Sequence, residues 1–419
     1  MKNFSDYTMY LPLILTQTTV AKDTFVRMNL PLSKLRGQCY KGASTMRGAR
    51  SGVATRICEE EPRAVYTHCY GHSINLAASD AVKESKLMRD ALDTIYEITK
   101  LIKYSPRREA IFFNLKQESD TSTGNPSPGI RVLCPTRWTV RANSLASIVS
   151  NYSALQSTWE EAVDLVRDSE TKARINGVSA QMRKFDFLLG TLLGEMLLQH
   201  TDNLNRTLQK TMSAAEGQQV GRMVIDTLAA VRTQTSFDLF WEKVAKFVES
   251  TDVEEPHIPR QHGTPKRFDP GSSSGDFHTS PKLYHRQLYY GAVDNVINCL
   301  KDRFNQPGYR LYCNLEQLLL KACQQKAFED EFQVICSFNK EDFYPDILRA
   351  QLLTFGINFA AYNKAHEAQH APTIFGIRAY FRSLSVGQRD LLHHIVRVMK
   401  LILVMPATNA SSERSFSAL

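Results

Sequence analysis

The stretch GQCYKGASTMRG, from Gly37 to Gly48, and the stretch YTHCYGHSINLA, from Tyr66 to Ala77, decide the fold. Apolar residues predict a strand over Leu35–Tyr40 that runs into a turn at Lys41, followed by a helix over Thr45–Ile57. Three acidic residues and Pro62 end that helix, and Ala64–Cys69 predict a second strand. A long helix then begins near His72. The order is strand, helix, strand, helix.

The rest of the chain is predicted to be almost wholly helical, because its apolar residues recur at helical spacing between charged ones. Two Ser-, Gly- and Pro-rich segments interrupt this pattern and are predicted to be an exposed loop and a flexible linker. The predicted helices are Val20–Leu30, Ile74–Lys103, several over 142–250, those from Tyr284 onward and Val386–Met399, with the loop at Gln117–Gly129 and the linker at 251–281.

The chain ends on a second apolar pattern. Leu401–Met405 is a short apolar run stopped by Pro406, which predicts a returning strand. Ala407–Leu419 then opens another helix, with Glu413 in its first turn.

Composition restricts the functional classes only weakly. The 419 residues are 43% hydrophobic and carry a net charge of +8, which suits a nucleic-acid partner but is shared by many proteins that bind none. The basic residues are unevenly distributed, since residues 31–56 include six of them and no Asp or Glu. They are Lys34, Arg36, Lys41, Arg47, Arg50 and Arg56. This block either meets phosphate or is a solvated basic face.

The eight cysteines lie far apart and form no paired C-x-x-C motif, which favours reduced thiols inside a cell. No apolar run reaches the roughly 20 residues that a membrane span needs, so we expect no membrane partner. Motifs for phosphate-binding loops, H-E-x-x-H metalloproteases and nucleophile elbows are missing from the sequence.

Four stretches together point to a family. Besides the two quoted above they are VLCPTRWTVR, from Val132 to Arg141, and MPATNASSERSFSAL, from Met405 to Leu419. In this order they resemble the hAT transposases and their domesticated relatives, most closely the zinc finger MYM-type protein 1-like group. The resemblance covers nearly the whole chain, and the TRW and ASSERSFS segments are specific in combination.

The resemblance implies an α/β RNase H-like core with a large all-α insertion, predominantly helical overall, whose opening strands would precede Met1. It implies a core segment over 1–72, a helical insertion over 73–395, and a returning strand and truncated C-terminal helix over 396–419. Family members usually carry an N-terminal zinc-binding finger and dimerise through the C-terminal region, here about 360–419.

The resemblance also implies three catalytic carboxylates that hold two Mg²⁺ ions, which accept oxygen ligands. The second acid of the family falls on Lys41, the first would lie before Met1, and only Glu413 matches its position. A cation about 4 Å from a divalent ion costs on the order of 8 kcal/mol at an effective dielectric near 20. We therefore expect no Mg²⁺ site and no catalysis, with Glu413 as a relic that also suits a first-turn position.

Two further groups of residues have a structural and a functional interpretation. Cys69 and His72 have half the spacing of a zinc finger but no second pair, so we expect a structural corner and no zinc site. Trp138 is either a packing anchor or a residue near a DNA end. The candidate DNA contacts are Lys34, Arg36, Arg47, Arg50, Arg137, Trp138 and Arg141.

We therefore expect a nuclear, non-enzymatic protein derived from a transposase, which assembles as a homo-oligomer or with other proteins through its C-terminal region and contacts DNA. Two alternatives stay open. One is an active DNA transposase that uses an unidentified acid, and the other is a non-functional fragment that does not fold alone.

Overall fold

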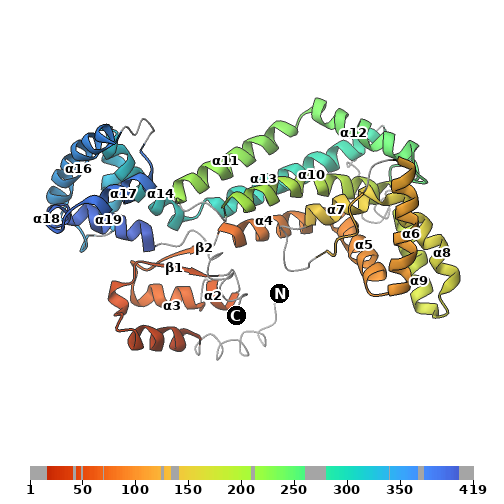
Figure 1. Cartoon of the computed structure of the whole chain (residues 1–419), viewed down its shortest axis with the longest axis horizontal. Helices are drawn as coiled ribbons and strands as arrows, with labels where there is room; N and C mark the ends of the chain where they lie inside the picture. The colour runs from red at the N-terminus through yellow and green to blue at the C-terminus, as the bar shows by residue number, and fades with distance from the viewer. Residues whose placement is uncertain are drawn as a thin grey trace, which may run out of the picture. The chain divides into compact units, whose positions relative to one another are not determined.

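The computed structural model is predominantly helical, as the sequence predicts (Figure 1). It describes residues 17–40, 44–48, 51–68, 70–123, 127–133, 141–208, 213–259, 280–338, 340–366 and 372–404. The chain divides into two compact units: unit 1 contains 1–73, 206–222 and 302–419, and unit 2 contains 74–205 and 223–301. None of the described helices is both long and apolar enough to cross a bilayer.

Unit 1 contains the two strands that the sequence predicts. They are β1 (Gly37–Tyr40) and β2 (Val65–His68), which pair in parallel from Gly37 opposite Val65 to Tyr40 opposite His68. The connection between them contains α2 (Ser44–Arg47) and α3 (Val53–Glu60), in place of the single helix predicted over Thr45–Ile57. A short apolar core of Val53, Ile57 and Ala64 joins α3 to β2.

The remainder of unit 1 is helical. A helix over residues 17–27 and the 3-10 helix η1 (Leu32–Lys34) precede β1. The C-terminal helices share one large apolar core, and Figure 1 shows them gathered together. They are α14 (Pro307–Cys323), α15 (Glu329–Phe338), α16 (Pro345–Ala365), α17 (Ile374–Ser383) and α19 (His393–Val404). The short helix α18 (Val386–Leu391) has no buried residue, and the core residues Leu384 and Leu392 lie on either side of it.

All regular secondary structure in the described residues of unit 2 is helical. Its helices are α5 (Lys86–Lys103), α6 (Pro106–Thr123), α7 (Arg141–Ser150), α8 (Tyr152–Leu165), α9 (Ser169–Met182) and α12 (Gln234–Glu249). Trp159 is 1% exposed in this unit and donates its indole N–H to the sulfur of Met182 at 3.1 Å. Residues of both units belong to α4 (Tyr70–Glu84), α10 (Phe185–Leu208), α11 (Ala214–Val231) and α13 (Pro281–Phe304).

Three local predictions are corrected by the structure. Residues 401–404 continue α19 as helix, so the strand predicted over Leu401–Met405 is wrong for those residues, and Met405 lies outside the described residues. Residues 117–123 end α6, so this part of the predicted loop is also wrong. The helix predicted over Ile74–Lys103 is two helices, because Ser85 accepts a hydrogen bond from the Met88 N–H and caps α5.

The domain division also differs from the expected one. The sequence placed 73–395 in one insertion, but residues 302–395 belong to the same unit as β1 and β2. The physical reason is that α14 packs on β2. Gly308 lies so close to this strand that an added Cβ would approach the Tyr66 carbonyl oxygen to 2.7 Å. The linker predicted at 251–281 is mostly outside the described residues.

Candidate functional site

The carboxyl ends of β1 and β2 lie at one edge of the sheet, because the two strands run in parallel with Tyr40 opposite His68. This is the edge where the resemblance places the second catalytic acid. Lys41, which replaces that acid, and Cys69 directly follow these strands in the sequence but lie outside the described residues, as does Glu413.

The described side chains at this edge are aromatic rings. Tyr40 stacks on Tyr66 with ring centroids 6.2 Å apart, Tyr66 lies 6.2 Å from His68, and His68 lies 5.2 Å from His72. Burial raises the pKa of the Tyr40 hydroxyl to about 12, so it stays protonated at neutral pH. Nowhere in the described part of the chain do three or more His, Cys, Asp or Glu side chains gather as they would around a metal ion.

The corner between β2 and α4 is held by stacked aromatic residues of unit 1. Tyr70 is 1% exposed and its ring lies 4.2 Å from Tyr309 and 5.5 Å from Phe304. Tyr309 donates its hydroxyl to the carbonyl oxygen of His68, and the Tyr70 hydroxyl donates to the carbonyl oxygen of Ala214 at 3.1 Å. These contacts favour the structural role predicted for this corner.

Among the candidate DNA contacts, Arg36 is already engaged inside the protein. Its Nε and Nη2 donate to the two carboxylate oxygens of Asp342 at 2.6 and 2.7 Å, and both side chains are only 15% exposed. The guanidinium holds the pKa of the Asp342 carboxyl below its usual range. A forked pair of this kind occupies the phosphate-binding face of the arginine, so Arg36 would have to leave Asp342 to contact a phosphate.

The other candidates divide between exposed, buried and undescribed positions. Lys34 ends η1 and is exposed, whereas Arg141 begins α7 and is 7% exposed. Burial makes Arg141 a poor phosphate ligand. The side chain of Arg47 and the residues Arg50, Arg137 and Trp138 lie outside the described residues.

Asp342 belongs to an ion-pair cluster that the sequence did not reveal. Arg63 pairs with Glu61 at 2.6 Å and with Glu341 at 2.6 Å, and Arg397 donates to the carbonyl oxygen of Asp342. The pKa of Glu61 is lowered mainly by its hydrogen bond from Arg63. The partners lie up to 306 positions apart in the sequence, so no local pattern could have predicted them.

The positive charge of the chain belongs to unit 1. Its sequence contains 26 basic and 17 acidic residues, a net charge of +9, whereas unit 2 contains 25 and 26, a net charge of −1. An excess of this size in one unit raises the local concentration of polyanions. Of the two units, unit 1 therefore carries the net positive charge.

Exposed apolar side chains lie in and just before the predicted C-terminal dimerisation region, about 360–419. Tyr344 is 70% exposed, Ile347 44%, Phe375 73% and Leu391 65%. A groove of about 410 Å³ lies between α16 and the end of α18, and Ile347, Ala350 and Leu391 line it. Clustered apolar exposure of this kind is typical of protein-binding surfaces.

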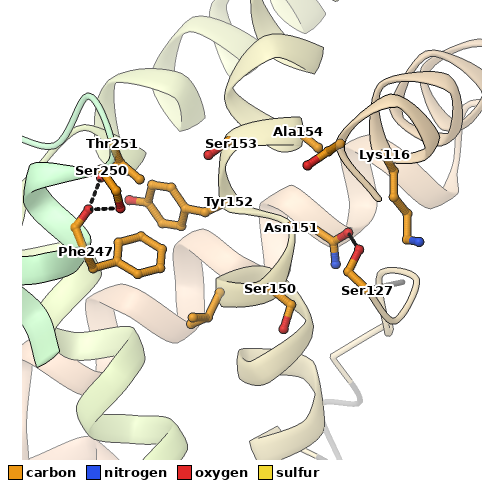
Figure 2. Close-up of a pocket in the computed structure, with 12 residues that line it drawn as sticks. Lys116, Ser127, Ser150, Asn151, Tyr152, Ser153, Ala154, Phe247, Ser250 and Thr251 are labelled. Carbon is orange, nitrogen blue, oxygen red and sulfur yellow. Dashed lines mark hydrogen bonds between the residues drawn. The ribbon is translucent and has the colours of Figure 1, made fainter. Parts of the chain in front are cut away.

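A small polar pocket of about 130 Å³ lies in unit 2 (Figure 2). Several of its hydrogen-bonding groups are already used within the protein: Ser127 donates to Asn151 at 2.9 Å, and Ser250 and Thr251 donate to the carbonyl oxygen of Phe247 at 3.0 and 2.8 Å. The ammonium of Lys116 is paired with Asp120. The pocket is therefore a place where helices of unit 2 pack against one another.

Comparisons with known proteins show a distant similarity to repressor proteins of two mammals. No protein-family model matches the sequence, and no solved structure matches it. The chain is 22% identical over 404 residues to the 52 kDa repressor of the inhibitor of the protein kinase from Mus musculus, and 22% identical over 402 residues to that of Homo sapiens. Each match covers 93% of this chain and 50% of the relative. The chain is thus distantly homologous, over nearly its whole length, to proteins named as repressors. It spans about half the length of these relatives.

Proposed function

We propose that this chain is a nuclear, hAT-type transposase derivative that does not cut DNA and acts by contacting DNA and assembling through its C-terminal helices. The observation that carries the proposal is Lys41, a basic residue directly after β1, where the resemblance requires a metal-holding carboxylate.

The arrangement of β1, α2, α3 and β2 supports an RNase H-like origin. A parallel pair joined through helices is the kind of connection that the later strands of such a sheet require. The long helical sequence after β2 fits the insertion that the resemblance implies.

The donor set does not fit a pair of Mg²⁺ ions. An ammonium at position 41 cannot ligate and would repel a divalent ion, and a lone carboxylate at Glu413 cannot hold two of them. We therefore propose no metal cofactor and no strand transfer.

The charge of unit 1 supports DNA contact, with Lys34 as the exposed candidate from the predicted set. The relatives are named as repressors, which favours a binding role over an enzymatic one. The exposed apolar side chains of α16 and α18 support assembly with a second copy or another protein.

A salt titration of DNA binding tests the first part. We expect the purified chain to retard duplex DNA at low salt, with an affinity that falls linearly on a logarithmic salt scale. Sedimentation tests the second part, and we expect association at micromolar concentration. A chain that stays monomeric and does not retard DNA would contradict the proposal.

Two other outcomes are distinguishable. Nicking of labelled DNA with Mg²⁺ or Mn²⁺ that disappears in Glu413→Gln would establish an active transposase. A thermal melt without a cooperative transition would establish a fragment that does not fold alone, as a sheet with only two described strands would favour.

A further inference from the structure

Helix α16 has apolar residues on both of its faces. One face is buried in the core of unit 1 through Leu348, Leu352, Phe355 and Phe359. The opposite face is exposed, yet it includes Leu353 at 59% and Ile357 at 63% exposure. A helix that is apolar all round is normally covered all round, so the exposed face calls for a partner.

The exposed face has the spacing of a coiled-coil seam. Six exposed residues follow one another at alternating intervals of four and three, which is the heptad spacing of positions that face a partner helix. They are Asp346, Ala350, Leu353, Ile357, Ala360 and Lys364. The two charged residues are at the ends of this seam and the four apolar residues lie between them.

Read in the opposite direction, these six residues place apolar residues opposite apolar ones and the acidic residue opposite the basic one. If a second α16 runs antiparallel about a two-fold axis near residue 355, Leu353 of each copy faces Ile357 of the other. In the same register Ala350 faces Ala360 and Asp346 faces Lys364. A parallel pair would instead oppose Asp346 to Asp346 and Lys364 to Lys364, which like-charge repulsion disfavours.

We propose that α16 pairs antiparallel with α16 of a second copy of this chain, through the seam from Asp346 to Lys364. The inference deepens the proposed assembly of the chain and rests on it. Small side chains at positions 350 and 360 let the two helices approach to about 8–10 Å. The same residue patch serves both copies, as a two-fold interface requires.

The groove beside the seam extends the interface. Ile347 and Thr354 follow the seam residues on one side of α16 and line this groove together with Leu391. On the other side, Arg349 is held by Glu329 at 2.7 Å and stacks over Phe332. A partner helix on the seam could therefore also contact the groove beside Leu391. On the side of α15, the Arg349–Glu329 ion pair marks the edge of the interface.

The first test removes the apolar centre of the seam. The double variant Leu353→Glu, Ile357→Glu alters only exposed positions, and circular dichroism would check that it folds. We expect sedimentation equilibrium to show at least a roughly 100-fold weaker dimer. Leu239→Glu, which alters a 64% exposed residue on α12, is the matched control and should leave the dimer unchanged.

The second test reads the direction of pairing. At low salt Asp346→Lys should weaken the dimer about tenfold, and Asp346→Lys combined with Lys364→Asp should restore it. Both variants lose Asp346, the acid in the first turn of α16, so any effect on helix stability is the same in both. A restored dimer therefore reports the charge pairing across the seam. In a parallel pair the single variant would only exchange one like-charge contact for another.

The outcomes separate this inference from the proposed function. A wild-type chain that neither associates with itself nor binds another protein contradicts both. A wild-type dimer that survives Leu353→Glu, Ile357→Glu overturns the seam but leaves assembly through another surface, and failure of the charge exchange to restore the dimer overturns the antiparallel register. A wild-type monomer that binds a different protein through these residues also overturns the second copy as partner.

Discussion

Units 1 and 2 contain nearly the same number of basic residues, 26 and 25, but differ in how these are balanced. In unit 2 acidic residues match them, and ion pairs such as Arg174 with Glu97, Arg232 with Asp294 and Lys282 with Asp238 occupy many of them at 2.5–2.6 Å. In unit 1 the acidic residues are fewer, at 17. The number of basic residues therefore does not distinguish the two units. The number of acidic residues that neutralise them decides which unit attracts a polyanion.

The largest effects should come from the two cores. Phe355→Ala empties a fully buried site in unit 1 and Trp159→Ala does so in unit 2, and each should cost about 3–5 kcal/mol. Hydrogen exchange of the full chain should show lost protection mainly in the unit that contains the change. The exposed control Leu239→Ala, at a residue that is 64% exposed on α12, should stay within about 0.5 kcal/mol. Equal loss of protection in both units would show that they do not behave as separate cores.

The basic side chains of unit 1 should include some that stabilise the fold through ion pairs and others that are exposed and bind DNA. Arg36→Ala leaves the half-buried Asp342 without its partner and should cost about 1–3 kcal/mol of unfolding free energy. Lys34→Ala should leave stability within about 0.5 kcal/mol but reduce the salt dependence of DNA binding by about one phosphate contact. If Arg36→Ala changes the salt dependence and not the stability, our assignment of Arg36 is wrong.

A buried carboxylate in unit 1 should give a pH signature. Glu316 is 2% exposed and accepts hydrogen bonds from the Ala214 and Ala215 N–H groups at 2.8 and 2.7 Å, and burial raises its pKa above 4.5. A raised pKa means that the folded state holds this proton more tightly, so the stability it contributes is present at low pH and lost as pH rises through the folded pKa.

Glu316→Gln should therefore cost roughly 1–2 kcal/mol near pH 5 and less at pH 8, because only the wild type pays for burying a charge. Denaturant unfolding of both proteins across this range measures the difference. A difference that stays constant or grows with pH would contradict the raised pKa.

The smallest effect concerns the break between α4 and α5 in unit 2. Ser85→Ala removes the cap that accepts from the Met88 N–H and should cost about 1 kcal/mol. Thr94→Ala, in the middle of α5, is the control and should change the free energy of unfolding little. Equal effects of the two changes would show that Ser85 does not set the helix start.

The local pattern was sufficient for the strands and most helices. The predicted strands Leu35–Tyr40 and Ala64–Cys69 correspond to β1 and β2 within two residues, because short apolar runs between turn residues have few other solutions. The apolar run at 401–404 misled the prediction, since it continues the helical face of Ile395 and Val398 into the same core. Residues 117–123 are polar in composition but extend a helix whose Ile111 and Phe112 are buried.

The candidate site depended more on distant contacts. Arg36 lies in a basic block that suggested phosphate, yet its partner Asp342 comes from the other end of the chain. The heptad seam on α16 became visible only once burial showed which face of this helix is already covered.

Lysine-selective crosslinking of the full chain to duplex DNA, mapped by mass spectrometry at low and high salt, tests the central comparison most directly. We predict that salt-sensitive crosslinks concentrate in unit 1 and include Lys34, while the ion-paired lysines of unit 2, such as Lys103 and Lys282, react weakly. Crosslinks that fall mainly in unit 2 would contradict the account.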